Sequence, residues 1–147
     1  MLRDSDAFNE DEVRVALEVL DVYLGSGKEA GLGGDYPHLV ARERGAAVGY
    51  VCIGKTPMTL CTFHLYWICV ARSVQRSGLG RALMQAAEEF ARERGGERVV
   101  VETAGKASYQ GTRQFYRDLG YAEAACIADY YAPGDALHVF VKRLRER

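Results

Sequence analysis

The pattern of apolar and polar positions divides the chain into predicted helices and strands. Apolar residues recur at helical spacing in residues 13–24 and 78–94, which predicts two amphipathic helices. Residues 109–119 predict a third, shorter helix that ends before Gly120. Runs rich in aromatic and β-branched residues predict six strands, at 38–44, 46–54, 62–70, 99–103, 122–131 and 137–141.

Turn-forming residues separate these elements. Asn9 and Glu12 form a possible capping box before the first helix. The glycine-rich stretch 25–35 predicts a loop, and Pro133-Gly134 predicts a type II turn between the last two strands. The resulting order predicts one α/β domain over residues 1–147, with a mixed sheet and helices on both faces. Ligands of such sheets bind beyond the carboxyl ends of parallel strands, at helix N-termini.

Composition narrows the classes of function. A chain of 147 residues with 48% hydrophobic residues and a net charge of −1 fits one folded domain. It has no large basic field, so nucleic acid is not expected as the main partner. No apolar run is long enough to span a membrane, and residues 1–4 do not begin a secretory signal. Four scattered cysteines and three histidines predict reduced thiols in a cytoplasmic protein and no metal site.

The residues between the strand 62–70 and the helix 78–94 carry the main chemical signal. Gly78 and Gly80 open the helix, where free amides and the helix dipole attract anions, and glycine lets the backbone approach a diphosphate. A dinucleotide fingerprint is excluded because Leu83 stands at its third glycine position, and Gly27-Lys28 fails the Walker A pattern. Gln75, Gly78 and Gly80 instead match the pattern [QR]xxGx[GA].

That pattern resembles the pyrophosphate-arm motif of the GNAT family of N-acetyltransferases. The segment 115–121 (FYRDLGY) is similar to a second signature of that family, FYxxxGF, at a fitting distance along the chain. The resemblance covers most of the chain. The wording TRxFY at residues 112–116 and the turn YxPGD at residues 131–135 resemble those of a bacterial or archaeal-type subgroup. The family resemblance implies a GNAT-like acyl-CoA fold with splayed central parallel strands, and a donor that is acetyl-CoA, with no metal.

The resemblance also implies which residues hold the coenzyme. Backbone amides of the loop and first helical turn would cradle its diphosphate: Gln75, Arg76, Ser77, Gly78, Leu79, Gly80 and Arg81. The pantetheine arm would enter between Ile68-Cys69-Val70 and Thr103 with its neighbours Glu102 and Ala104, and an amide at Cys69 or Val70 would polarise the thioester carbonyl. Tyr109 stands where the family often has asparagine, and Arg113 is either a ligand of the adenosine 3′-phosphate or the partner of a carboxylate.

Catalysis in the family usually proceeds by direct attack of an amine in a ternary complex. Tyr116 matches the usual general acid for the leaving thiolate. Strand alternation is expected to place His64, Tyr66, Ile68 and Val70 on one face. His64 is the preferred general base, with Tyr66, or Glu102 through a water, as alternatives. Cys69 as a covalent nucleophile is disfavoured, since its side chain is expected to pack in the sheet.

The acceptor amine has no readable motif. A small amine, an amino acid, an aminoglycoside and a protein amine all fit an N-acetyltransferase, and the alternative function is a non-catalytic acyl-CoA sensor. Asp35, Asp129 and Asp135 are candidates to attract a cationic amine, although solvation at the surface is the preferred interpretation for each of them, as it is for the basic run 142–147. The family often pairs sheet edges, so a homodimer is expected.

Overall fold

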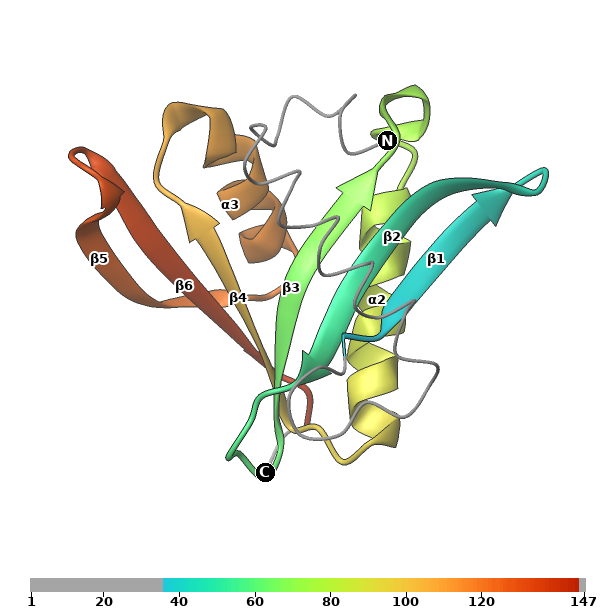
Figure 1. Ribbon diagram of the computed structural model, residues 1–147, viewed down its shortest axis with the longest axis horizontal. Helices are drawn as coiled ribbons and strands as arrows, with labels where there is room; N and C mark the ends of the chain where they lie inside the picture. Colours follow the sequence, from blue (N-terminus) through green and yellow to red (C-terminus); the bar gives the residue numbers. More distant parts are fainter. Residues whose placement is uncertain (1–35, 146–147) are drawn as a thin grey trace.

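Six strands form one sheet in the computed structural model, which describes residues 36–145 (Figure 1). Their order across the sheet is β1-β2-β3-β4-β6-β5. The strands are β1 (His38–Glu43), β2 (Ala46–Lys55), β3 (Thr62–Val70), β4 (Arg98–Ala104), β5 (Ala122–Ala132) and β6 (Asp135–Arg143). The α-helices are α2 (Leu79–Glu93) and α3 (Gln110–Asp118), and two short 3-10 helices are η1 (Arg72–Val74) and η2 (Ala107–Tyr109). The bounds of these strands and α-helices lie within two residues of the predicted ones, whereas the two 3-10 helices were not predicted.

Strand directions are mixed, as predicted. β3 and β4 are parallel, and α2 connects them, whereas every other neighbouring pair is antiparallel. β1 and β2 join through Arg44 and Gly45, which both have positive φ, the conformation that a two-residue type I′ hairpin turn requires. β5 and β6 join through Pro133-Gly134, where Gly134 has a φ of 80°, in agreement with the predicted type II turn.

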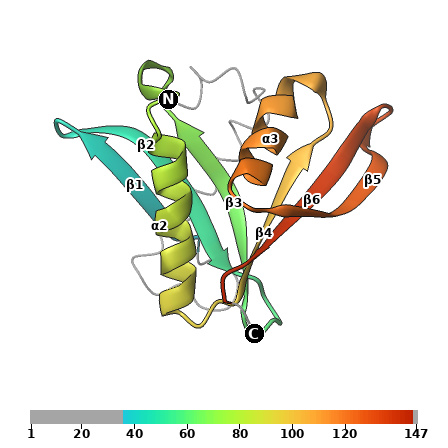
Figure 2. The same ribbon diagram turned by 180° about the vertical axis from the view of Figure 1, so that it is seen from behind.

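Both described α-helices pack against the same face of the sheet, α2 behind β1–β3 and α3 beside β4 and β6 (Figure 2). One core forms there from α2, α3 and the strands, with Met84, Val99 and Phe140 fully buried. The predicted helix at 13–24, its capping box and the loop at 25–35 lie outside the described residues, so a helix on the opposite face stays a prediction. None of the helices within residues 36–145 has the length and apolar character needed to cross a membrane.

A β-bulge in β3 changes which side chains face the core. Cys52 pairs with Trp67, but the next residue, Ile53, pairs with Leu65, so Tyr66 is an extra residue in β3. An extra residue reverses the alternation of faces along the strand. Phe63 and Leu65 therefore lie on the helix-covered face before the bulge, and Ile68 and Val70 pack on that face after it.

The bulge corrects the expectation that His64, Tyr66, Ile68 and Val70 share one face. His64 and Tyr66 lie on the face away from α2, with ring centroids 4.8 Å apart. Val70 faces α2 instead, since its Cγ2 lies within 4.0 Å of the position a Cβ would take at Gly80. The core-facing side chains of β3 are therefore at odd-numbered positions before the bulge (Phe63 and Leu65) and at even-numbered positions after it (Ile68 and Val70).

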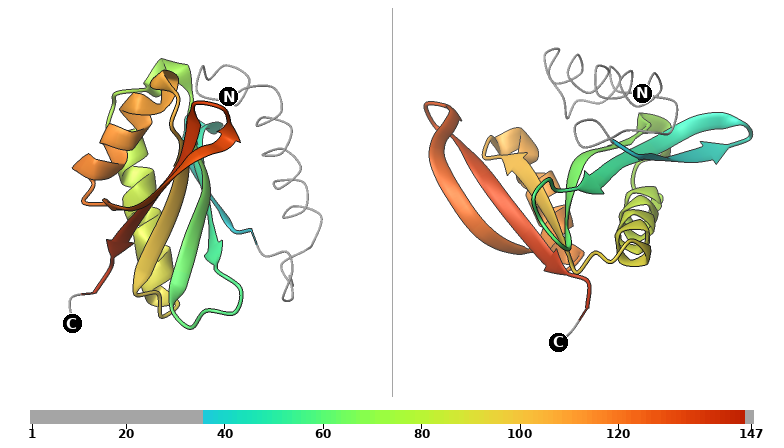
Figure 3. Two further views of the ribbon diagram at one scale, coloured as in Figure 1. Left: turned by 90° about the vertical axis from the view of Figure 1, so that its left-hand side faces the viewer. Right: turned by 60° about the horizontal axis from the view of Figure 1, so that its bottom comes forward.

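The sheet opens between its two central strands. β3 and β4 pair only from Thr62↔Arg98 to Leu65↔Val101, although β3 continues beside β2 to Val70 and β4 continues beside β6 to Ala104. The right-hand view of Figure 3 shows β1–β3 diverging from β4–β6. This splay leaves the backbone groups on the facing edges of both strands without sheet partners.

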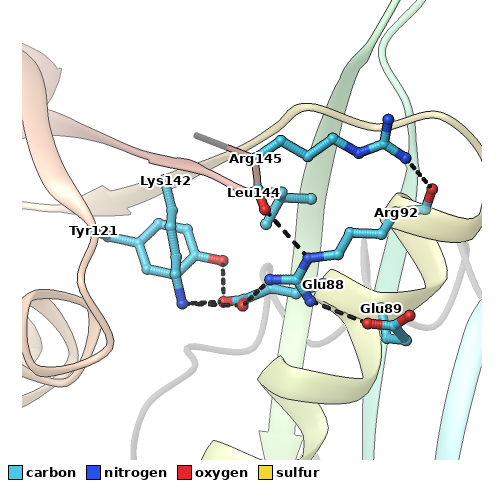
Figure 4. Close-up of polar contacts among 7 residues, drawn as sticks. All are labelled: Glu88, Glu89, Arg92, Tyr121, Lys142, Leu144 and Arg145. Carbon is cyan, nitrogen blue, oxygen red and sulfur yellow. Dashed lines mark hydrogen bonds and ion pairs between the residues drawn. The ribbon is translucent and has the colours of Figure 1, made fainter. Parts of the chain in front are cut away.

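A buried carboxylate ties α2 to the carboxyl-terminal strand. Glu88 is 4% exposed, and both of its oxygens accept hydrogen bonds from Lys142 Nζ at 2.9 Å. Tyr121 donates its hydroxyl to Glu88 Oε1 at 3.1 Å, and Arg92 lies 3.6 Å from Oε2 (Figure 4). Lys142 and the buried Leu144 are thus part of the packed structure, which corrects the expectation of a solvated run from residue 142.

Candidate active site

A cleft of about 1360 Å³ occupies the opening between β3 and β4. Its walls come from both freed strand edges, the loop before α2, the first turn of α2, and α3. It is lined from the helix-covered face by Gly80, Phe115 and Tyr116, and from the opposite face by His64 and Tyr66. A molecule lying in the gap is therefore accessible to groups from both sides of the sheet.

The loop before α2 is held by its own polar side chains. Gln75 Nε2 donates to the carbonyl oxygen of Val70 at 3.3 Å, and Ser77 Oγ donates to that of Val74 at 2.6 Å. Arg76 and Gly78 both have positive φ, 59° and 88°, which turns the chain sharply into the helix. These contacts account for two of the polar side chains of the loop, Gln75 and Ser77, which both bond back to preceding carbonyl groups.

The N-terminus of α2 supplies free backbone donors to this cleft. The hydrogen bond from Ala82 N to Gly78 O, at 3.0 Å, is the first of the helix, so the amides of Leu79, Gly80 and Arg81 have no acceptor within it. A Cβ at Gly80 would meet Phe115 at 3.4 Å, an ordinary van der Waals distance, and one at Gly78 would meet nothing within 4 Å. The space beside Gly78 is therefore open, although its positive φ favours glycine there, whereas Gly80 packs against Phe115 and Val70.

Most of the residues predicted from the sequence line this one cleft. They are His64, Ile68, Val70, Gln75, Arg76, Gly78, Gly80, Arg81, Thr103, Tyr109 and Tyr116. Four others are not part of its lining: Cys69, Ser77, Leu79 and Arg113. Cys69 is 3% exposed, and burial raises the pKa of its thiol, which argues against a nucleophilic role.

Arg113 is engaged with the backbone at the end of β4. Its Nη1 donates to the carbonyl oxygens of Ala104 at 2.7 Å and Lys106 at 3.1 Å. Asp135 holds the same segment from the other side, because its Oδ1 accepts from Gly105 N at 3.1 Å and its Oδ2 lies 3.6 Å from Lys106 Nζ. Asp135 is 5% exposed, so the expectation of a solvated surface carboxylate was wrong there.

Tyr116 places a protonated phenol in the cleft wall. It is 4% exposed, and its ring packs against Tyr121 and Phe140 with centroids 5.9 and 6.1 Å away. Burial raises the pKa of Tyr116 well above its usual range, because the charged phenolate is poorly solvated there. The hydroxyl therefore stays protonated at any physiological pH and can donate a proton.

His64 lies on the other side of the gap with an acidic neighbour. Burial lowers the pKa of its imidazole, and the charge of Glu102 opposes that shift in part. His64 pairs with Val100 across the parallel strands, and Glu102 is two residues further along the same edge of β4. The imidazole is neutral at pH 7 and can accept a proton.

Thr103 contributes a polar atom that has no protein partner. The residue is 6% exposed, and its Oγ1 is buried without a hydrogen bond while lining the cleft. Such an atom is costly unless a ligand satisfies it. The cleft also includes Trp67, Lys106 and Ser108, which the sequence did not single out, because strands and loops give no motif for them.

Comparisons with known proteins agree with this geometry. The family model described as acetyltransferase (GNAT) family matches residues 7–121. The chain belongs to the GNAT family of acetyltransferases. A solved GNAT-family protein of Desulfovibrio desulfuricans is 34% identical, with a TM-score of 0.91, over 98% of this chain and 88% of that one.

Two further proteins are similar to this GNAT acetyltransferase, one in sequence and one in fold. The tRNA uridine(34) acetyltransferase of Methanocaldococcus jannaschii is 30% identical over 82 residues, which is 56% of this chain and 13% of that protein. The chain thus spans a small part of that relative. An aminoglycoside 6′-N-acetyltransferase solved in complex with coenzyme A shares the fold, with a TM-score of 0.67 and 15% identity over 97% of each chain. The family match, the similarity to the Desulfovibrio desulfuricans protein and the six-stranded sheet of residues 36–145 all agree with membership of this acetyltransferase family.

Proposed function

We propose that this enzyme takes an acetyl group from acetyl-CoA and transfers it to a primary amine by direct attack in a ternary complex. One observation carries the proposal: the splay of β3 from β4 and the free amides of α2 open into the same cleft. A diphosphate needs amide donors and room for close approach, and an extended amide-bearing arm needs unpaired strand edges. The proposal is supported by the aminoglycoside 6′-N-acetyltransferase that shares this fold, because that protein was solved in complex with coenzyme A.

The thioester lies, in this proposal, where β3 and β4 separate. Ala71 N donates to Val48 O in β2 at 2.8 Å, and successive amides of a strand point to opposite edges. The amide of Val70 therefore points away from β2, toward the gap, and the amide of Cys69 toward β2. Val70 N is our candidate for the donor that polarises the thioester carbonyl.

Acid and base act from opposite faces of the sheet. His64, on the face away from α2, accepts the proton that the attacking amine loses. Tyr116, on the helix-covered face, donates a proton to the departing thiolate sulfur. Glu102 and Tyr66 lie beside His64, so the positive charge that His64 gains is stabilised by the Glu102 carboxylate.

Calorimetric titration with acetyl-CoA tests the donor site. We expect micromolar binding to the unmodified protein and no detectable binding to Gly78→Asp, since a carboxylate would face the diphosphate. Gly78→Asn has the same shape and tolerates positive φ, so it isolates the effect of charge and should weaken binding far less. Gly95→Asp, at a second open glycine of positive φ beyond the other end of α2, is the control for strain.

Turnover separates an enzyme from a sensor. The protein is incubated with acetyl-CoA and a panel of alkylamines, amino acids, aminoglycosides and peptides, and free thiol is measured. Amine-dependent thiol release that Gly78→Asp abolishes supports the proposal. Binding of acetyl-CoA without release for any amine class would instead support a sensor, and equal binding by Gly78→Asp would contradict the assignment of the loop.

A further inference from the structure

A second group of reactive side chains lies on the β5–β6 hairpin, outside the cleft. Cys126 and His138 are direct partners across the antiparallel strands, and Cys126 Sγ lies 3.9 Å from His138 Nε2. On the other side of the ring, His138 Nδ1 lies 2.6 Å from Glu123 Oε1. The three residues form a line of thiol, imidazole and carboxylate.

The contact with Glu123 selects one tautomer of the neutral His138 ring, since the nitrogen that faces a carboxylate carries the proton. The hydrogen bond with His138 is the main cause that lowers the pKa of Glu123, with Arg117 Nη2 contributing at 3.0 Å from its other oxygen. Glu123 is therefore a carboxylate at neutral pH and accepts the Nδ1 proton of His138. The lone pair of Nε2 then faces the thiol, which is the arrangement that activates a nucleophile through a base oriented by a third group.

The three side chains differ in their exposure to solvent. The side chain of His138 is only 18% exposed and that of Glu123 is 32% exposed, whereas Cys126 is an exposed residue. The ring of His138 stacks on the fully buried Phe140, with centroids 6.5 Å apart. The base is thus held by packing on its far side, and the thiol remains accessible from solvent.

From this geometry we propose that Cys126 is a nucleophile, with His138 as its base and Glu123 as a positioning residue, that accepts acyl groups from small thioesters. The thiol gives its proton to His138 Nε2, and Cys126 Sγ forms a bond to the thioester carbonyl carbon. The tetrahedral intermediate collapses, its original C–S bond breaks, and His138 returns the proton to the departing thiolate. The products are S-acyl-Cys126 and a free thiol, so the step requires no oxidant or reductant.

The test uses a thioester too short to need the cleft. The full chain is incubated with S-acetyl-N-acetylcysteamine in the presence of EDTA, and acetylated cysteines are located by mass spectrometry of peptides. Cys61 is the internal control, because it is partly exposed and has no histidine contact among the described residues. We expect Cys126 to be acetylated at least about tenfold faster than Cys61, a threshold set below the roughly 10²-fold or more that a positioned base typically gives.

Substitutions of His138 and Glu123 distinguish activation of the Cys126 thiol by a base from simple exposure of that thiol to solvent. His138→Gln should lower the rate at Cys126 at least about tenfold and leave Cys61 unchanged, and Glu123→Gln should lower it less, with Glu123→Asp restoring part of the rate. Thermal unfolding confirms that each variant is folded.

Equal rates at Cys126 and Cys61, or no effect of His138→Gln, would overturn the proposal. So would a zinc ion that co-purifies with the protein and blocks labelling until EDTA removes it, because the three side chains would then form a metal site. Gly78→Asp should retain labelling, which keeps this result independent of the proposed acetyl-CoA site.

Discussion

Leu65 and Val101 are the last residues that pair across the parallel strands β3 and β4. Beyond them the strands separate, and each stays bonded to its outer neighbour. Both side chains are buried in the core below the gap, at 4% and 1% exposure. The opening is therefore built on a packed base, which keeps its two edges in fixed positions for a ligand.

Thr103, two residues past Val101, should show opposite effects on stability and binding. Thr103→Val removes a buried hydroxyl that has no partner, so we expect the free protein to gain about 1 kcal/mol in the free energy of unfolding. If the hydroxyl bonds the pantetheine arm, acetyl-CoA should bind roughly threefold to tenfold more weakly. Urea unfolding and calorimetric titration measure the two effects.

Thr56 provides the matched control for that experiment. Its Oγ1 is also buried without a partner, and the residue is not part of the cleft lining. Thr56→Val should therefore stabilise the protein without changing the affinity for acetyl-CoA. A similar loss of affinity in both variants would show that Thr103 has no specific contact with the donor.

Tyr116→Phe should reduce turnover far more than binding. Loss of a positioned general acid costs roughly 10²-fold or more in kcat, whereas the ring and its packing against Phe140 remain. Tyr121→Phe is the control, since this second buried tyrosine bonds Glu88 outside the cleft and should affect stability alone. A timed thiol-release assay measures the kcat of each variant, and calorimetry measures its affinity for acetyl-CoA. A parallel loss of kcat and affinity in Tyr116→Phe would exclude Tyr116 as the general acid.

Periodicity and turn residues were sufficient to predict the strands and the two α-helices of residues 36–145. The expected helix at 78–94 and the hairpin at Pro133-Gly134 are confirmed with shifts of one or two residues at most of the ends. The motif around Gly78 located the cleft for a physical reason, because free helix amides beside a splayed strand need glycine there. Glycine leaves a visible signature in a sequence, and so this part of the site could be predicted.

The remaining features depend on relationships that a sequence does not record. One extra residue at the bulge, Tyr66, reversed the faces of Ile68 and Val70, and alternation alone gives no sign of such an insertion. Asp135 and Lys142 were expected to be solvated because they are charged, but each has a partner distant in the chain, Gly105 and Glu88 respectively. Cys126 and His138 likewise meet only through strand register.

Glu88→Gln should destabilise the fold by about 2 kcal/mol. The substitution leaves Lys142 beside a neutral amide, and breaking a buried pair costs more than forming it gains. The Lys142 side chain is 26% exposed, so solvent offsets part of the loss. Urea unfolding measures it, with Glu89→Gln as the control: Glu89 is 61% exposed and pairs with the same Arg92 at 3.1 Å, so its loss should change stability by less than about 0.5 kcal/mol. Equal effects of the two substitutions would contradict a special role for the buried carboxylate.

The pH dependence of the reaction should identify His64 as the base. Burial lowers its pKa below the usual value of 6.5, so kcat/KM should rise as the pH increases through that lowered pKa and level off near neutrality. The free energy of unfolding should also rise with pH over this range, because below about pH 6.5 the unfolded chain binds the proton more readily than the folded chain does. His38 shares the lowered pKa, also through burial, but is not part of the cleft lining. His38→Gln should therefore flatten only the stability profile, whereas His64→Gln should also remove the acidic limb of kcat/KM. An unchanged rate profile in His64→Gln would transfer the role to Tyr66 or to Glu102 acting through a water.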